Sequence, residues 1–184
     1  TGTVSLPPPP GGALCEILFG PEPTENGVVP VAVFTDINCP NCAALENRLL
    51  RLEQETGSIA LHWHPYPVLG PRSVWGAQVT LAAQEQGAME AVHRDLMQRV
   101  LPPGPAGVRD LSQRHNLDAD RLFRDAQSNR TRAKIGSNLA LGAALGLPGT
   151  PSTMIGRTLV IGAISTRDIE RLVELELTAG PLPC

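Results

Sequence analysis

The stretch VAVFTDINCPNCAALENRLLRLEQ, residues 31–54, decides the fold that this sequence predicts. At its centre, Cys39 and Cys42 form a C-x-x-C pair. The apolar and β-branched run before them, residues 28–35, is typical of a strand that is buried on both faces. The segment after them predicts a helix that ends at Gly57. The core face of this helix consists of leucines at helical spacing: Leu45, Leu49 and Leu52.

The rest of the chain predicts further strands around a helical block. Residues 58–68 predict a second strand, and a strand, a helix and a strand at this spacing form a βαβ unit with parallel strands. Residues 72–147 have almost no strand signal and predict about five helices, with a break after the second of them at residues 102–107. Residues 147–165 predict a β-hairpin with its turn at Gly156 and Arg157.

Local signals predict two helix starts and one more strand. Asp118 is a good N-cap for a helix of the helical block, and Ser165 with Asp168 resembles a capping box at the last helix. Residues 13–19 predict a short strand. The core face predicted for the last helix consists of Ile169, Leu172, Val173 and either Leu175 or Leu177.

These elements predict an α/β fold in which a mixed central sheet is flanked by helices and interrupted by an all-helical subdomain. The size of the chain, 184 residues, is enough for one domain with such an insertion. We expect four parts along the chain: a Pro/Gly-rich tail or tether at 1–13, a first α/β part with the two cysteines at 14–71, the helical insertion at 72–147, and a second α/β part at 148–184.

Composition and charge exclude several classes of protein. A net charge of −3 offers no electrostatic footprint for nucleic acid, and no apolar stretch is long enough to span a membrane. The chain opens TGTVSLPPPPGG, without an initiator Met or a signal peptide, which we interpret as a chain whose targeting segment is missing. This proline-rich opening is either a disordered end or a spacer from a membrane anchor.

The C-x-x-C pair could belong to a metal site. A zinc site needs four ligands, usually from two such pairs, whereas the other cysteines are isolated near the chain ends. His62 and His64 lie two residues apart on a predicted strand and face the same side, so a site of two cysteines and two histidines is conceivable. This spacing is not that of a recognised metal site, and we expect no metal.

A dithiol that exchanges electrons has a more direct physical basis. A cysteine at a helix N-terminus lies near the positive end of the helix dipole and near unpaired N–H groups, which stabilise the reactive thiolate. Cys39 falls at the predicted cap and Cys42 one turn further on, so the two sulfurs can close a small ring. The outer thiol would attack, and the inner thiol would resolve the mixed disulfide.

In these features the chain resembles the DsbA family of bacterial thiol–disulfide oxidoreductases, which have a thioredoxin fold with a helical insertion. The stretch FTDINCPNC resembles the strand, loop and active-site helix of the family, and the helical block falls where the family has its insertion. The segment GTPS places Thr150 and Pro151 where the family has its cis-proline loop. The resemblance covers residues 28–178.

The resemblance implies roles for particular residues. Cys39 would be the nucleophile and Cys42 the resolving thiol, with Pro40 and Asn41 tuning their acidity. Pro151 would be cis and lie against the disulfide, and Thr150 would offer its backbone to an extended substrate peptide. Without the dithiol, an ordinary trans proline would be the simpler interpretation of Pro151, because cis is the minority state.

The sequence departs from the family pattern at three positions. The family's strong oxidants have His where this chain has Asn41, and Thr150 takes the place of Val, as in isomerase-type relatives. Enzymes with this fold often bury an acid six residues before the nucleophile, where this chain has Val33. Asp36 is closer to the dithiol, but we expect it to be a solvated loop residue or a cap. These departures leave the direction of electron flow open.

The remaining cysteines, Cys15 and Cys184, have two interpretations. In an oxidising compartment they would form a structural disulfide that closes a loop of nearly the whole chain, adding about 4–5 kcal/mol in the entropy model. Alternatively both are thiols. An even number of cysteines slightly favours the disulfide.

The predicted function is therefore that of a periplasmic or otherwise extracytoplasmic thiol–disulfide oxidoreductase, with no cofactor beyond its redox-active disulfide. We expect partly folded, cysteine-containing proteins as substrates, a membrane redox partner and a monomer. The oxidase role is favoured over the isomerase role, because the few residues before the first strand are too short for the dimerisation segment that isomerase relatives carry. The alternatives are a reductase of periplasmic disulfides and a carrier of metal such as copper. A thioredoxin-like scaffold with an inert cysteine pair is a further alternative.

Overall fold

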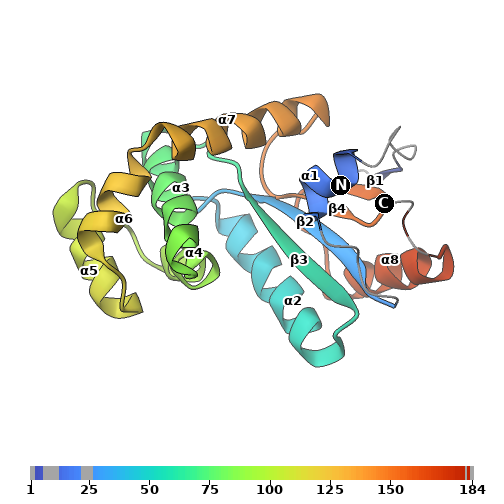
Figure 1. The fold of residues 1–184 in the computed structure, drawn as a ribbon. Helices are drawn as coiled ribbons and strands as arrows, with labels where there is room; N and C mark the ends of the chain where they lie inside the picture. The colour runs from blue at the N-terminus through green and yellow to red at the C-terminus, as the bar shows by residue number, and fades with distance from the viewer. Residues whose placement is uncertain (1–2, 6–12, 22–26, 181, 183–184) are drawn as a thin grey trace. The chain divides into compact units, whose positions relative to one another are not determined.

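The computed structural model describes residues 3–5, 13–21, 27–180 and 182. Figure 1 shows the elements in chain order. They are β1 (Thr3–Ser5), α1 (Ala13–Phe19), β2 (Val29–Thr35), α2 (Pro40–Thr56), β3 (Ile59–Pro65), α3 (Pro71–Ala83), the 3-10 helix η1 (Gln84–Gln86), α4 (Met89–Gln98), α5 (Pro105–His115), α6 (Ala119–Ala126), α7 (Asn129–Ala144), β4 (Ser152–Ile155), β5 (Thr158–Ile161) and α8 (Thr166–Thr178).

The described strands form one mixed sheet, as the sequence predicts. Its order is β1-β5-β4-β2-β3, and the pairs β1–β5, β5–β4 and β4–β2 are antiparallel. β2 and β3 run parallel, because hydrogen bonds join Val29 to Ser58 at one end and Thr35 to Tyr66 at the other, with numbers rising along both strands. Every residue of β2 is buried, which confirms a strand covered on both faces.

The chain divides into two compact units. One, here called the sheet unit, consists of Thr1–Phe34, Ala44–His64 and Pro148–Cys184. The other, here called the helical unit, consists of Thr35–Ala43 and Pro65–Leu147. The turn before the dithiol and the first residues of α2 therefore group with the helical unit.

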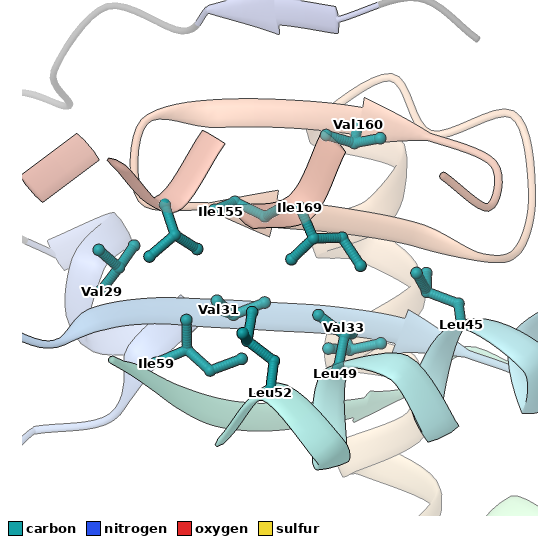
Figure 2. Close-up of a cluster of buried hydrophobic side chains, with 11 residues drawn as sticks. Val29, Val31, Val33, Leu45, Leu49, Leu52, Ile59, Ile155, Val160 and Ile169 are labelled. Carbon is teal, nitrogen blue, oxygen red and sulfur yellow. The ribbon is translucent and has the colours of Figure 1, made fainter. Parts of the chain in front are cut away.

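The core of the sheet unit gathers around β2. Figure 2 shows side chains of this cluster, which come from β2, α2, β3, β4, β5 and α8. Leu45, Leu49 and Leu52 of α2 are all buried in it, as the helical spacing predicts. Burying one such leucine is worth about 1.5–3 kcal/mol, so this face fixes α2 on the sheet.

The helical unit is built around α3. This helix is mostly buried and packs against α4, α6 and α7. Its small residues at the contacts, such as Ala82 and Ala83, let neighbouring helices approach closely. Two predicted helix ends are also confirmed: the Asp118 carboxylate accepts a hydrogen bond from Arg121 N–H, and α2 ends before Gly57, whose φ is +61°.

Two sequence predictions about elements are wrong. Residues 13–19 form helix α1 rather than a strand, because the buried residues Cys15, Leu18 and Phe19 have helical spacing. Leu175 and Leu177 of α8 are exposed, and the buried residue at that end of the helix is Glu176. Its carboxylate accepts hydrogen bonds from Arg157 and Thr158, which explains why a charged residue can be buried there.

Two other elements differ in extent from the sequence analysis. Helix α5 starts at Pro105, inside the segment expected to be a break, because proline is well tolerated in the first turn of a helix. Within the predicted tail, Thr3–Ser5 forms β1 and pairs with β5. The cap at Ser165 is as predicted, with its hydroxyl accepting a hydrogen bond from Asp168 N–H.

Candidate active site

A turn of four residues carries the chain from β2 to the dithiol. The Cys39 N–H donates a hydrogen bond to the Asp36 carbonyl over 3.0 Å, and the Asn38 N–H donates to Asp36 Oδ1 over 2.9 Å. Aspartate is favoured at the first position of such turns because its side chain can bond the backbone two residues on. The turn places Cys39 directly before Pro40, the first residue of α2.

Cys39 is the N-cap of α2. The Cys42 N–H donates a hydrogen bond to Cys39 Sγ over 3.2 Å, and the N–H groups of Cys42 and Ala43 also approach the Cys39 carbonyl. An N-cap side chain normally accepts such a bond through oxygen, and here sulfur takes that place. Negative charge on this sulfur would be stabilised by the N–H and by the positive end of the helix.

The two cysteines differ little in exposure. Both are reduced, with 6% of Cys39 and 0% of Cys42 exposed, while Pro40 and Asn41 between them are exposed. The order of exposure agrees with Cys39 as the outer thiol. It is more deeply buried than expected for an attacking cysteine.

The Asp36 carboxylate is buried beside this turn, with 2% of the residue exposed. Besides the Asn38 N–H, it accepts hydrogen bonds at Oδ2 from the N–H groups of Val68 and Leu69, over 2.9 and 3.0 Å. The expectation of a solvated loop residue is therefore wrong, and the expectation of a cap is right. The motif Asp-x-Asn before a cysteine is the sequence signal that identifies this turn.

Further contacts within the helical unit hold the turn against α3. The Asn38 side chain donates a hydrogen bond to the hydroxyl of the buried Ser73 over 2.9 Å. Gly76 of α3 lies so close to Ile37 that a Cβ on residue 76 would overlap the Ile37 side chain. Glycine at this position is thus required by the close approach of the turn.

An apolar surface lies on the segments around the turn. Val68 and Leu69, which follow β3, are 41% and 53% exposed, and Val74 of α3 is also exposed. A cavity of about 130 Å³ is lined by Ile37, Asn38, Arg72 and the segment 96–101.

The predicted proline loop lies in the sheet unit. The Thr150–Pro151 peptide bond is cis. The Pro151 carbonyl accepts a hydrogen bond from Gly162 N–H over 2.8 Å, and the Ser152 hydroxyl donates to the Gly149 carbonyl over 2.7 Å. These bonds fix the loop at the start of β4.

His62 and His64 both contact other groups of the sheet unit. His64 Nε2 lies 2.9 Å from the Leu18 carbonyl, and its ring stacks on Phe34. His62 meets the ring of Phe19 edge-on. Burial lowers the pKa of His62, and the charge of His64 lowers it further. Among the described residues, no group of three or more His, Cys, Asp and Glu side chains is placed to hold a metal ion.

Cys15 of α1 is disulfide-bonded and buried. Cys184, its predicted partner, lies outside the described residues, so this pairing stays a prediction.

Comparisons with known proteins identify the family. A family model described as DSBA-like thioredoxin domain matches residues 30–174, which is more than half of the chain. A thioredoxin-like oxidoreductase from Silicibacter pomeroyi DSS-3 is 30% identical, with a TM-score of 0.77 over 87% of this chain and 95% of that chain. The chain therefore belongs to the family of DSBA-like thioredoxin domains.

Two other similarities extend this picture. A periplasmic thioredoxin-like protein from Salmonella enterica serovar Typhimurium shares the fold, with 24% identity and a TM-score of 0.74 over 90% of this chain and 96% of that chain. A curated relative, the Na(+)/H(+) antiporter NhaA 3 of Salinispora tropica, is 26% identical over 129 residues. This match includes 69% of the chain, which spans only about a fifth (20%) of the length of that relative.

Proposed function

We propose that this protein is an extracytoplasmic thiol–disulfide oxidoreductase that forms or rearranges disulfide bonds in substrate proteins. The observation that carries the proposal is the hydrogen bond from the Cys42 N–H to Cys39 Sγ at the start of α2. It provides a donor for the charge that develops on Cys39 when a mixed disulfide is resolved. Membership of the DSBA-like family supports the same activity.

In the oxidising direction the reaction consists of two exchanges. A substrate thiolate attacks Cys39 Sγ of the Cys39–Cys42 disulfide, which forms a mixed disulfide and releases Cys42 as a thiolate that takes up a proton. A second substrate thiolate then attacks the substrate sulfur of the mixed disulfide, and Cys39 leaves as a thiolate. The substrate loses two electrons and gains a disulfide, and the dithiol of the enzyme is reduced.

Two features favour opposite directions of electron flow. Asn41 cannot supply the positive charge that a histidine would place near the thiolate, which makes the disulfide less oxidising. Val33 is apolar and fully buried, so this chain has no negative charge at the position where enzymes with this fold often have an acid. Without that charge the thiolate is repelled less, which makes the disulfide more oxidising. We propose the oxidising direction, and reduction of disulfides is the alternative.

The substrates that we propose are partly folded proteins with cysteines. Exposed Val68 and Leu69 in the helical unit suit apolar segments that a folded protein would bury. In the sheet unit, the Pro151 carbonyl is already bonded to Gly162, so strand addition by a substrate peptide is proposed at Thr150, as the family resemblance implies. A membrane redox partner would reoxidise the dithiol, and no cofactor is needed.

The proposed location is the periplasm or another oxidising compartment. The similarity to a periplasmic protein and the disulfide at Cys15 support it. None of the helices among the described residues is long and apolar enough to cross a membrane. Similarity to part of an antiporter supports the alternative that the domain is attached to a membrane protein.

The test is the equilibrium reduction potential of the Cys39/Cys42 pair, titrated against glutathione and measured by mass spectrometry after thiol trapping. A value of about −120 to −180 mV would support a donor of disulfides, and one near about −270 mV would indicate a reductase. Cys42→Ser is the matched variant. Its Cys39 thiolate can attack a peptide disulfide, which forms a mixed disulfide and releases the other peptide sulfur as a thiolate, but the resolving thiol is missing, so the mixed disulfide should accumulate.

Failure of both measurements would contradict the proposal. A dithiol that never equilibrates with glutathione, together with a Cys42→Ser variant that traps no peptide, would leave an inert scaffold or a metal carrier. Stoichiometric binding of Cu(I) by the reduced protein would then distinguish the carrier from the scaffold.

A further inference from the structure

Asp36 is a buried carboxylate for which the reaction itself has no use. It lies three residues before Cys39 and is 2% exposed. A buried charge of this kind is costly unless hydrogen bonds satisfy it. The hydrogen bonds that Asp36 accepts offset the cost of its burial, and they indicate its structural role.

The three donors to the carboxylate are all backbone N–H groups. Oδ1 accepts from Asn38, and Oδ2 accepts from both Val68 and Leu69. Three N–H donors occupy both oxygens of the carboxylate and hold it in one orientation. This arrangement fits a fixed clamp.

The two oxygens bind two different segments of the helical unit. Oδ1 closes the turn that presents Cys39 as the N-cap of α2, and the Asp36 carbonyl completes the same turn through Cys39 N–H. Oδ2 fixes the backbone of the segment after β3, where Val68 and Leu69 expose their apolar side chains. One carboxylate thus links the reactive sulfur to an apolar surface.

We propose that Asp36 is a positioning residue that sets both the capping geometry of Cys39 and the presentation of Val68 and Leu69 to substrate. The role of Asp36 in presenting Val68 and Leu69 rests on the proposed function, whereas its role in the capping geometry of Cys39 does not. Asp36 acts through these neighbours and does not itself touch the reacting sulfurs.

Two substitutions separate the two arms of the clamp. In Asp36→Ser, the hydroxyl can still accept the Asn38 N–H, because serine forms the same local turn as aspartate. The shorter side chain cannot also hold Val68 and Leu69. In Asp36→Ala both arms are lost. Glu176→Gln is the matched control, since it neutralises a buried, hydrogen-bonded carboxylate in the sheet unit.

The first experiment measures the clamp directly, by hydrogen exchange of backbone amides in the full chain. In Asp36→Ser, the amides of Val68 and Leu69 should exchange at least about tenfold faster while that of Asn38 stays protected. In Asp36→Ala, all three should exchange faster. Glu176→Gln should leave all three unchanged. Unchanged protection of Val68 and Leu69 in the serine variant would overturn the proposal.

The second experiment measures reactivity, through the rate at which iodoacetamide alkylates Cys39 and the KM and kcat for oxidation of an apolar dicysteine peptide, with oxidised glutathione as the oxidant that regenerates the Cys39–Cys42 disulfide. Asp36→Ser should keep the alkylation rate within about twofold and raise KM severalfold. Asp36→Ala should also slow alkylation by about fivefold, the size expected for loss of one helix-cap hydrogen bond. A role limited to stability would move neither quantity in the folded variants.

The outcomes distinguish this inference from the proposed function. If the unmodified protein oxidises no peptide, the proposed function fails, while the amide exchange and the alkylation rates still decide the capping role of Asp36. If the protein oxidises the peptide but both Asp36 variants match it in alkylation rate and KM, the positioning role is wrong and the proposed function stands. Should the alanine variant not fold, the serine variant decides.

Discussion

The backbone N–H of Cys42 lies 3.2 Å from Cys39 Sγ and donates a hydrogen bond to it. Because Cys39 directly precedes the first residue of α2, the proposed nucleophile is also the cap of the active-site helix. The same bond therefore contributes to the stability of the helix and to the reactivity of the sulfur.

This double role predicts different effects of two substitutions at residue 39. Serine is a good N-cap, so Cys39→Ser should keep the free energy of unfolding within about 0.5 kcal/mol of the reduced protein. Cys39→Ala removes the cap acceptor and should lower that free energy by about 1 kcal/mol. Both should abolish disulfide exchange. Urea unfolding under reducing conditions measures the difference, and equal stability of the two variants would show that the sulfur does not cap the helix.

Gly76 and Ile37 form a second pair, in which the Ile37 side chain leaves no room for a side chain on residue 76. A methyl group on Gly76 would overlap the Ile37 side chain, so Gly76→Ala should force the turn before Cys39 to move, at a cost of about 1–3 kcal/mol. In the double variant Gly76→Ala/Ile37→Ala, the loss in free energy of unfolding should be smaller by at least about 0.5 kcal/mol than the sum of the losses in the two single variants. The four proteins are compared by urea unfolding.

Gly136 of α7 provides the control for this cycle. A Cβ there would meet no atom within 4 Å, so Gly136→Ala should stabilise the protein by about 0.5–1 kcal/mol through helix propensity alone. Simple additivity of the Gly76 and Ile37 substitutions would contradict the steric argument.

The fold and the dithiol follow from the sequence because short-range patterns determine them. The buried run before Cys39 and the leucines after it fix β2 and α2 through local periodicity, and a C-x-x-C between a strand and a helix places the sulfurs at a helix start. The helix at residues 13–19 was missed because a short apolar segment fits either period, and only the burial of Cys15, Leu18 and Phe19 decides between them.

Buried carboxylates are the part of the structure that the sequence did not predict. Asp36 was expected to be a solvated loop residue or a cap, and no sequence pattern singled out Glu176, since charged side chains are rarely buried. Their donors come from far along the chain, such as Val68 and Leu69 for Asp36 and Arg157 for Glu176. Contacts of this range depend on tertiary packing and leave no local pattern in the sequence.

A carboxylate between α4 and α5 predicts a loss of stability in acid. Asp95 accepts hydrogen bonds from Arg114 and His115, each over 2.8 Å. Burial raises the pKa of Asp95, but the hydrogen bonds and charges of Arg114 and His115 outweigh it and leave the pKa below its ordinary value of 3.8. The ionised form therefore stabilises the fold above about pH 4, and this contribution disappears as pH falls through the lowered pKa.

Asp95→Asn should accordingly reduce the free energy of unfolding at pH 7 by about 1.5–3 kcal/mol, with the difference from the unmodified protein shrinking below pH 4. Asp110→Asn is the control, because Asp110 also pairs with Arg114 but its side chain is 68% exposed. It should cost no more than about 1 kcal/mol. Chemical unfolding at several pH values measures both, and equal effects of the two substitutions would refute the role of burial.

The lowered pKa of His62 leads to a second pH dependence of stability, at higher pH than that of Asp95. Burial and then the charge of His64 lower its pKa below 6.5, so the unfolded chain takes up a proton more readily than the folded one. Stability is then fully present above pH 6.5 and is lost as pH falls from there towards the lowered pKa. His62→Phe should flatten this dependence while keeping a ring against Phe19, and His64→Phe should move the titration midpoint of His62 upward by removing the neighbouring charge. NMR titration of the His62 ring measures the midpoint, and a value at or above 6.5 in the unmodified protein would contradict the argument.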